Sequence, residues 1–467
     1  MSLESKIAKW FESRLGLKAT VLRPVPEYSF NPFYWLGALT VIAFLMQAFT
    51  GLLMLIYYVP ATDQAYSSTV YIIKTVPLGW LIETVHLYGA YAMILLASLH
   101  MFRGYFVSVQ KKPREMMWVT GMLMGLVVLG FGLTGYLLPW TVVSKSATDV
   151  SIGMLSFLPA QIGSVLTFLL AGTGSNVAEL SRFFDLHIVV LPAGLLVLLA
   201  LKMYMFEVHG AAEPSTGPKP SKEVPWFPRV YLYFAMIGSV FVAAVLLASA
   251  LFPVSLSAEF SPQAASGYVP QPEWYFLSLY QVLKFASFEG EGIYYALGGV
   301  TVILALFVLL PFIDRGTKRD AASRPFYTTI GLILIAELAT LTVWGYFTPG
   351  QVIPDLQALV IIVGVALVIA IMTALTYRMR NKMRGLPIGK LGLRFMALPL
   401  RHRTITAMFV GLLVIGSVSM AGLVRSLAAG SIGFAAPFLN FIVLVSSFCF
   451  MARILRNLTL RQRGTLL

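Results

Sequence analysis

The sequence predicts an all-α fold, a polytopic transmembrane helical bundle of about ten spans. Of the 467 residues, 58% are hydrophobic and 12% are charged, and the mean hydropathy is +0.81. This composition is typical of a membrane protein and not of a soluble domain. Apolar segments close to the ~20 residues that cross a bilayer recur along the chain. They cover 33–58, 80–107, 116–138, 181–206, 228–251, 293–313, 327–346, 353–376, 405–424 and 434–453.

Basic residues gather in alternate loops, after the second, sixth, eighth and tenth expected spans. Short loops rich in Lys and Arg stay on the cytoplasmic side of a membrane, so both termini and these loops are expected in the cytoplasm. In a soluble protein the net charge of +14 would suggest nucleic acid. Topology accounts for the charge here, and no nucleic-acid partner is expected. Residues 1–27 mix aromatic and basic residues, which predicts a short helix on the membrane surface.

The second expected span carries two histidines, His86 and His100, fourteen residues apart. At about 1.5 Å and about 100° per residue they lie ~21 Å apart on nearly the same helix face. One imidazole then lies toward each side of a membrane ~30 Å thick, His86 outward and His100 toward the cytoplasm. Ionisable groups at this depth predict two stacked metal or haem sites. The alternative is a pair of hydrogen-bonded or snorkelling core histidines.

The fourth expected span provides a partner for only one of these histidines. His187 can face His86 as the second ligand of one haem, but about four turns later the chain has Lys202 and no histidine. A lysine amine binds iron only when it is neutral, a state that burial in an apolar site favours. Three alternatives stay open: Lys202 is the ligand, a methionine or a shifted helix register supplies one, or the inner haem is five-coordinate or missing. The methionines are Met203 and Met205.

Glycines repeat the fourteen-residue interval, with Gly37 and Gly51 in the first span and Gly121 and Gly135 in the third. A flat macrocycle between helices needs a residue without a side chain at each level, so we interpret these glycines as clearance for two haems. Ordinary small-residue helix packing is the alternative, since the chain holds 38 glycines.

The chain has a single cysteine, Cys449. One thiol forms neither a CxxCH haem attachment nor an iron–sulfur cluster. Any haem held by His86 and His187 is therefore expected to lack a CxxCH attachment, and any iron–sulfur centre is expected on a partner protein.

Two connections on the expected outer side are long, residues 139–174 and 252–292. Long ordered loops are usually functional, and together these two could cover a pocket beside the His86 haem. The second loop carries Glu273. A carboxylate in an apolar pocket has a raised pKa, which suits it to accept and pass on a proton. The alternative is a loop carboxylate that caps the following helix.

Several motifs then resemble one family. They are the run from Gly132 to Trp140 (GLTGYLLPW), the run from Pro272 to Tyr275 (PEWY), His86 with His100, and the run from Ser181 to His187 (SRFFDLH). In these motifs the chain resembles cytochrome b, the quinol-oxidising membrane subunit of cytochrome bc complexes, in a prokaryotic, fused form. The resemblance runs from about Pro24 to Phe347, and the last three expected spans have no matched counterpart.

The resemblance implies two non-covalent haems of b or a type in a four-helix bundle. His86 and His187 would hold the outer haem and His100 the inner haem, with Lys202 at the position of the family's fourth ligand. Glu273 would accept a proton from quinol, with two tyrosines nearby. The two tyrosines are Tyr136 and Tyr275. Arg103 is expected to contact a cofactor. His209 is expected either to line an inner quinone pocket or to be a surface histidine.

The expected organisation has four parts: an interfacial segment (1–27), the haem-binding bundle (28–210), a C-terminal cytochrome b part with the quinol loop (211–350) and extra transmembrane helices (351–467). The resemblance implies quinol oxidation in a prokaryotic plasma membrane, electron transfer across it, and proton release outside. Expected partners are a Rieske iron–sulfur protein, membrane quinol, a terminal oxidase or other acceptor, and a second copy in a homodimer. The alternative is a linear quinol dehydrogenase subunit with an altered or missing inner haem.

Overall fold

The computed structural model describes residues 10, 13–14, 24–157, 160–172, 175–210, 212 and 223–384. The chain divides into two compact units, 1–377 and 378–467. The described part is mostly helical, as predicted. Most of the expected interfacial segment, most of the basic stretch after the eighth span, and the expected spans 405–424 and 434–453 lie outside the described residues.

Eight helices in the described part are long and apolar enough to cross a membrane, and they coincide with the first eight expected spans. The protein is therefore a multi-pass membrane protein. The helices that form these spans are α3 (Leu36–Leu55), α5 (Gly79–Val107), α6 (Glu115–Leu137), α9 (Asn176–Asp185) continuing into α10 (Leu191–His209), α11 (Tyr231–Leu251), α14 (Ile293–Val308), α16 (Pro325–Phe347) and α17 (Asp355–Arg384).

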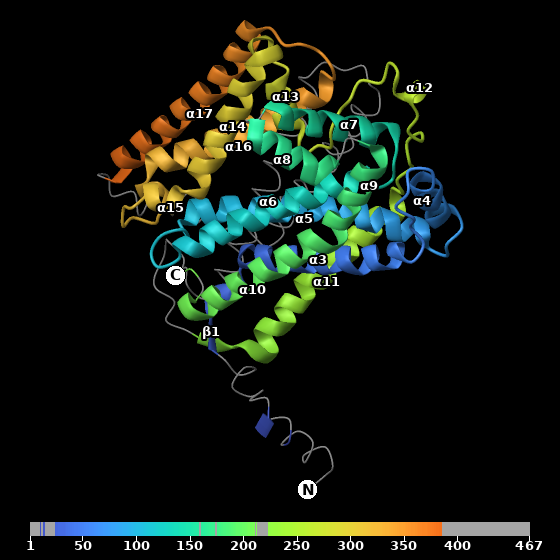
Figure 1. Ribbon diagram of the computed structural model, residues 1–467. Coiled ribbons are helices and arrows are strands. Elements are labelled where there is room, and N and C mark those ends of the chain that lie inside the picture. The colour runs from blue at the N-terminus through green and yellow to red at the C-terminus, as the bar shows by residue number, and fades with distance from the viewer. Residues whose placement is uncertain are drawn as a thin grey trace, which may run out of the picture. The chain divides into compact units, whose positions relative to one another are not determined.

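Four of these helices form the first bundle. Helix α3 packs on α5, α5 on α6, and α6 on α10, while α11 lies against α3 and α5. Figure 1 shows these five helices running side by side. Local sequence sets the ends of α10: proline stands in its first turn and Gly210 follows it at φ +67°, a conformation that glycine adopts without strain. The N-terminal strand β1 (Pro24–Pro26) pairs antiparallel with β2 (Glu223–Pro225), just before α11.

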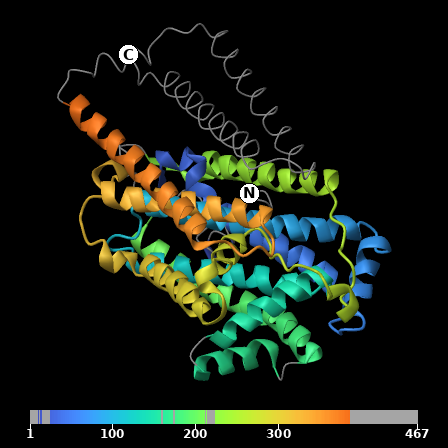
Figure 2. The ribbon, with the colours of Figure 1, turned by 90° about the horizontal axis from the view of Figure 1, so that it is seen from above.

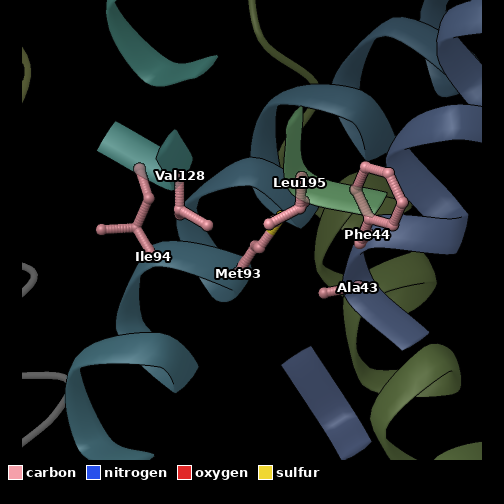
Figure 3. Close-up of a cluster of buried hydrophobic side chains, with 6 residues drawn as sticks. All are labelled: Ala43, Phe44, Met93, Ile94, Val128 and Leu195. Atoms are coloured by element: carbon pink, nitrogen blue, oxygen red, sulfur yellow. The ribbon is translucent and has the colours of Figure 1, made fainter. Parts of the chain in front are cut away.

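The core of this bundle is a compact apolar layer contributed by α3, α5, α6 and α10. Figure 3 shows its six buried side chains directed toward one another between the helices. They are Ala43, Phe44, Met93, Ile94, Val128 and Leu195. Each is at most 8% exposed, so the layer is apolar and closely packed.

The remaining membrane helices form a second group. In Figures 1 and 2, α14, α16 and α17 lie together on the side of the molecule away from α4 (Ala65–Lys74). Short helices α13 (Leu277–Leu283) and α15 (Leu310–Ile313) flank α14. A buried cluster around Phe285, Trp344 and Ile353 joins this group, and the Ile353 amide donates to the carbonyl of Lys284 at 2.8 Å.

The two long loops that were expected to meet do so. The first contains α7 (Val142–Gly153) and α8 (Ala160–Ala171), and the second contains α12 (Pro262–Ala265). Thr141 and Ser144 form a capping box that starts α7. Thr141 also bridges to Glu259 of the second loop, so the loops are tied together above the end of α6.

Candidate functional site

The first bundle brings the four candidate ligands together in two pairs, each opposite a glycine on the neighbouring helix. We call them the His86 level, with His86 and His187, and the His100 level, with His100 and Lys202. A Cβ built on Gly51 would lie 3.3 Å from Cε1 of His86, and one on Gly135 would lie 2.5 Å from Cε1 of His187. A methyl group at the second distance cannot be accommodated without movement. The glycines therefore make room for the two imidazoles.

The two imidazoles of the His86 level face each other with ring centroids 6.3 Å apart. Metal–imidazole bonds are about 2 Å long, so two rings on opposite sides of one metal ion have centroids separated by roughly 6 Å. Side chains from α5 and from the turn just before α10 thus lie at the separation that a single iron requires.

One threonine fixes each of these histidines. The Nδ1 atom of His86 lies 2.9 Å from the Thr50 hydroxyl, and that of His187 lies 3.1 Å from the Thr134 hydroxyl. Each hydroxyl donates its own hydrogen to a backbone carbonyl one turn earlier, at 2.7 and 2.8 Å. The hydroxyl therefore accepts from Nδ1–H, which leaves the Nε2 lone pair for a metal.

His187 lies in a π-helical turn, Leu186–Val190, between α9 and α10. Such turns insert one extra residue into a helix and occur frequently at functional sites. The turn changes the register of α10 relative to α9 at the residue that faces His86.

The His100 level has the same layout with a different fourth side chain. A Cβ on Gly37 would lie 3.1 Å from Cε1 of His100, and one on Gly121 would lie 2.8 Å from the amine of Lys202. His100 and Lys202 are close enough to interact electrostatically. Met203, one of the alternatives from the sequence, is 49% exposed and does not belong to this pair.

Polar atoms at the His100 level lack partners. The buried Nδ1 of His100 has no hydrogen bond in the described part of the chain, and no hydrogen bond or ion pair joins the Lys202 amine to the described residues. The amide of Gln47, between the two levels, is likewise buried without a partner. Buried polar groups are normally paired, so the His100 level differs from an ordinary packed core.

By their place along α5 and α6, the residues drawn in Figure 3 lie midway between the two levels. Met93 is seven residues from both His86 and His100, and Val128 is seven residues from both Gly121 and Gly135. The bundle thus alternates open levels with a packed layer. Paired ligands, glycine clearance and unpartnered polar atoms fit a flat haem macrocycle, which supplies the other iron ligands itself.

A separate small cleft lies beside the His86 level. It contains all three residues predicted for quinol chemistry, and α7 of the first long loop forms one wall. Its lining comprises Leu133, Tyr136, Ala147, Ser151, Pro272, Glu273, Tyr275 and Phe276. Leu133 and Tyr136 flank the Thr134–Gly135 pair, which places the cleft within one helical turn of the His187 contacts.

Glu273 is the only carboxylate in the lining of this cleft. The Tyr91 hydroxyl donates to its Oε2 at 2.7 Å. Burial raises the pKa of Glu273, while the hydrogen bonds from Tyr91 and from the Trp274 backbone lower it by less. Gly132 makes room for Tyr275, because a Cβ there would lie 2.9 Å from the phenol oxygen.

The two other predicted residues lie near the cytoplasm-facing ends expected from topology. The guanidinium of Arg103 lies 4.0 Å from the ring centre of Tyr34 and interacts electrostatically with His100. His209 ends α10, and its backbone carbonyl accepts from Arg114 at 3.0 Å. Arg103 therefore joins the His100 level, whereas the described contacts of His209 are those of a helix end.

Sequence reasoning missed the two threonines, Tyr91 and the π-helical turn. The threonines carried a visible signal, because Thr50–Gly51 and Thr134–Gly135 are matching Thr–Gly pairs at one level. Tyr91 carried none, since it lies 182 residues from Glu273 and only the fold brings them together.

Comparison with known proteins identifies the family of the chain. Two family models match, cytochrome b/b6/petB over residues 22–210 and cytochrome b (C-terminal)/b6/petD over residues 269–363. The second match extends beyond Phe347, where the motif resemblance was expected to end, into α17.

Three relatives and one solved structure illustrate the similarity. A cytochrome bc complex cytochrome b subunit of Chlorobaculum thiosulfatiphilum is 33% identical over 351 residues, 72% of this chain and 80% of the relative. A cytochrome b of Sulfolobus acidocaldarius is 34% identical, over 72% of this chain and 65% of the relative. Cytochrome b6 of Acaryochloris marina is 37% identical over 45% of this chain and 99% of the relative.

The solved structure, named hyperthermophilic respiratory Complex III, matches with a TM-score of 0.65 at 24% identity, over 79% of this chain and 96% of that chain. At this identity it supports the fold alone. The relatives and the family matches assign the chain to a family. The chain therefore belongs to the cytochrome b family, the haem-binding membrane subunits of bc-type oxidoreductase complexes.

Proposed function

We propose that this chain oxidises quinol in the cleft around Glu273 and moves electrons across the membrane between two haems, with proton release on the outer side. The observation that carries the proposal is the arrangement of the first bundle. Glycines make room at the His86 and His100 levels, an apolar layer separates these levels, and the cleft with Glu273 lies beside the His86 level. The basic loops favour the orientation in which the His86 level is outer and both termini are cytoplasmic.

His86 and His187 would hold the outer haem through their Nε2 atoms, with Thr50 and Thr134 fixing both rings. His100 would hold the inner haem. Bound haem supplies reversible one-electron transfer through its iron. The ligand side chains would hold the iron atoms in place. The apolar layer would exclude water from the space between the two levels.

Oxidation of one quinol to quinone releases two electrons and two protons. Glu273 in its carboxylate form accepts one proton from a quinol hydroxyl, and its raised pKa makes it a better proton acceptor than an ordinary carboxylate. Tyr91 holds the carboxylate in place, and Tyr136 and Tyr275 complete the cleft. The second proton would leave to water on the outer side, and the two electrons would go one each to an iron–sulfur partner of the Rieske type and to a haem held by His86 and His187.

Lys202 is the proposed fourth axial ligand, binding through its neutral amine. One contact supports this: the Lys202 amine lies against Gly121, as the His187 ring lies against Gly135. The departure from histidine also favours a second candidate, a linear quinol dehydrogenase subunit whose inner haem is altered or missing. The first proposal also includes an inner quinone pocket near His209. The protein would assemble as a homodimer and deliver electrons to a terminal oxidase.

A redox titration of the purified complex followed by its haem spectrum tests the proposal. We expect two haems of different potential, with His86→Ala and His187→Ala each losing the same one and His100→Ala losing the other. A wild-type spectrum with one haem would favour the linear dehydrogenase. Different haems lost from His86→Ala and His187→Ala would show that these two residues do not share an iron.

A further inference from the structure

Tyr91 ties Glu273 to α5, the helix that also carries His86. The Tyr91 hydroxyl donates to Oε2 of Glu273 at 2.7 Å, across 182 residues of sequence. No other side chain in the described part of the chain donates a hydrogen bond to this carboxylate. One phenol therefore occupies Oε2, and Oε1 stays free of side-chain donors from the described residues.

The ring of Tyr91 fixes where its hydroxyl lies. The ring centroid is 6.2 Å from that of Trp274 and 6.4 Å from that of Tyr275, the two residues that follow Glu273. Aromatic pairs at such separations are stabilising beyond the area that they bury. Tyr275 in turn lies against Gly132 of α6, so the segment that carries Glu273 is held between α5 and α6.

The cleft offers no positive charge that would stabilise the ionised form of Glu273. Besides this carboxylate, its lining from α6, α7 and the second long loop contains two phenols and uncharged side chains, with no lysine, arginine or histidine. The phenols are Tyr136 and Tyr275. The buried cation of α7, Lys145, pairs with Asp149 and Glu179 instead.

The hydrogen bond from Tyr91 therefore has an electrostatic effect as well as a steric one. A hydrogen bond to a carboxylate favours its ionised form, and bonds to ionised groups are stronger than those between neutral groups. Burial raises the pKa of Glu273, and the bonds from Tyr91 and from the Trp274 backbone oppose this rise. Removal of the Tyr91 hydroxyl should raise that pKa further.

We propose that Tyr91 is a positioning residue for quinol oxidation, which keeps Glu273 ionised and leaves its Oε1 atom as the oxygen that takes the quinol proton. This inference rests on the proposed oxidation of quinol at Glu273. Tyr91 is not among the residues that line the cleft, so it acts through the carboxylate and not by contact with the substrate.

The test compares Tyr91→Phe with Tyr88→Phe as the matched control. Tyr88 lies about one helical turn earlier on α5, and its hydroxyl donates at 2.8 Å to the carbonyl of Phe252, at the start of the same long loop. Each variant keeps its aromatic ring and loses one hydrogen bond to this loop. The two variants therefore differ in whether the acceptor that is lost is a carboxylate or a neutral carbonyl.

In Tyr91→Phe we expect the rising limb of the pH–rate profile to move up by about one pH unit, which corresponds to a tenfold change in the acidity of Glu273. At a fixed pH below the limb, kcat should fall about tenfold. KM for quinol should change little, because Tyr91 does not touch the substrate. Tyr88→Phe should retain the wild-type profile.

Infrared spectra measure the same shift without turnover. The carbonyl stretch of protonated Glu273 can be identified by its absence in Glu273→Gln. In Tyr91→Phe this band should persist to a pH about one unit higher than in the wild type, and in Tyr88→Phe it should titrate as in the wild type.

Equal pH–rate profiles and equal infrared titrations in the two phenylalanine variants would overturn the inference. So would a further change in kcat when Tyr91→Phe is added to Glu273→Gln, because a residue that acts through the carboxylate has no effect once the carboxylate is gone. A wild-type rising limb in Glu273→Gln alone would instead refute the proposed function of Glu273 as proton acceptor.

Discussion

The histidines of the His86 level are each positioned by a threonine that comes directly before a clearing glycine. Thr50 and Gly51 act on His86, and Thr134 and Gly135 act on His187. The inner level has no such hydrogen bond to His100 among the described residues. Single residues therefore distinguish two sites that share one backbone layout. Glu273 and Lys202 differ most from ordinary core residues.

Glu273→Gln should lower quinol oxidation by roughly 10²-fold or more, because it removes the proton acceptor. In the wild type the carboxylate is the active form. Its pKa lies above the ordinary value of about 4.3, so turnover should rise as pH increases through that raised pKa. The variant should lose this limb of the pH–rate profile while it keeps its haem spectrum. Glu259→Gln, in the exposed part of the same loop, is the control; a common profile for the two variants would exclude Glu273 as the acceptor.

Lys202→Ala should open one coordination position on the inner haem and let it bind carbon monoxide when reduced. Lys202→His should close the position again, because an imidazole then replaces the amine. Visible and resonance Raman spectra report both changes. Met203→Ala, at an exposed neighbouring position, should leave the spectrum as it is in the wild type. An inner haem that stays low-spin and closed in Lys202→Ala would show that another group is the ligand.

At the scale of elements, the glycines of α6 differ in whether an added side chain would clash with a neighbouring residue. Gly125 and Gly135 share this helix, but a Cβ on Gly125 would meet nothing within 4 Å, while one on Gly135 would lie 2.5 Å from His187. Gly135→Ala should therefore displace the His187 ring and lower the occupancy of the outer haem. Gly125→Ala should retain full haem content, and the helix itself should gain up to about 1 kcal/mol from the better helix former. Equal haem content in the two variants would show that Gly135 provides no clearance.

Much of this arrangement could be predicted from sequence because it is periodic. The fourteen-residue interval recurs in α3, α5 and α6, and a helix converts such an interval directly into depth. The π-helical turn could not be predicted, since it depends on how α9 and α10 pack against α6 and not on a local residue signature. Tyr91 was missed for a related reason: its hydrogen bond to Glu273 exists only after α5 and the second long loop meet.

For the molecule as a whole, a buried charge cluster joins the first bundle to the second helical group. Asp314 pairs with Lys111 of the α5–α6 loop and with Arg324 at the start of α16. Asp314→Asn leaves two buried cations without their partner, which costs about 3–5 kcal/mol. We expect a clearly lower melting temperature of the detergent-solubilised protein. Asp320→Asn, which loses only a contact to Ser323, should change it little, and similar melting temperatures would show that the cluster does not join the two groups.

The apolar layer of Figure 3 has a consequence for energy conversion. Electrons tunnel through closely packed apolar side chains, whereas a proton needs a continuous chain of water or hydrogen-bonding groups, which the six side chains of this layer do not provide. Under the proposed assignment, negative charge moves inward through Met93, Val128 and Leu195 while positive charge stays outside. Each crossing then works against the membrane potential, about 2.3 kcal/mol for every 100 mV. The six apolar side chains would thus keep the separated charges apart, so that electron transfer stores energy as a membrane potential.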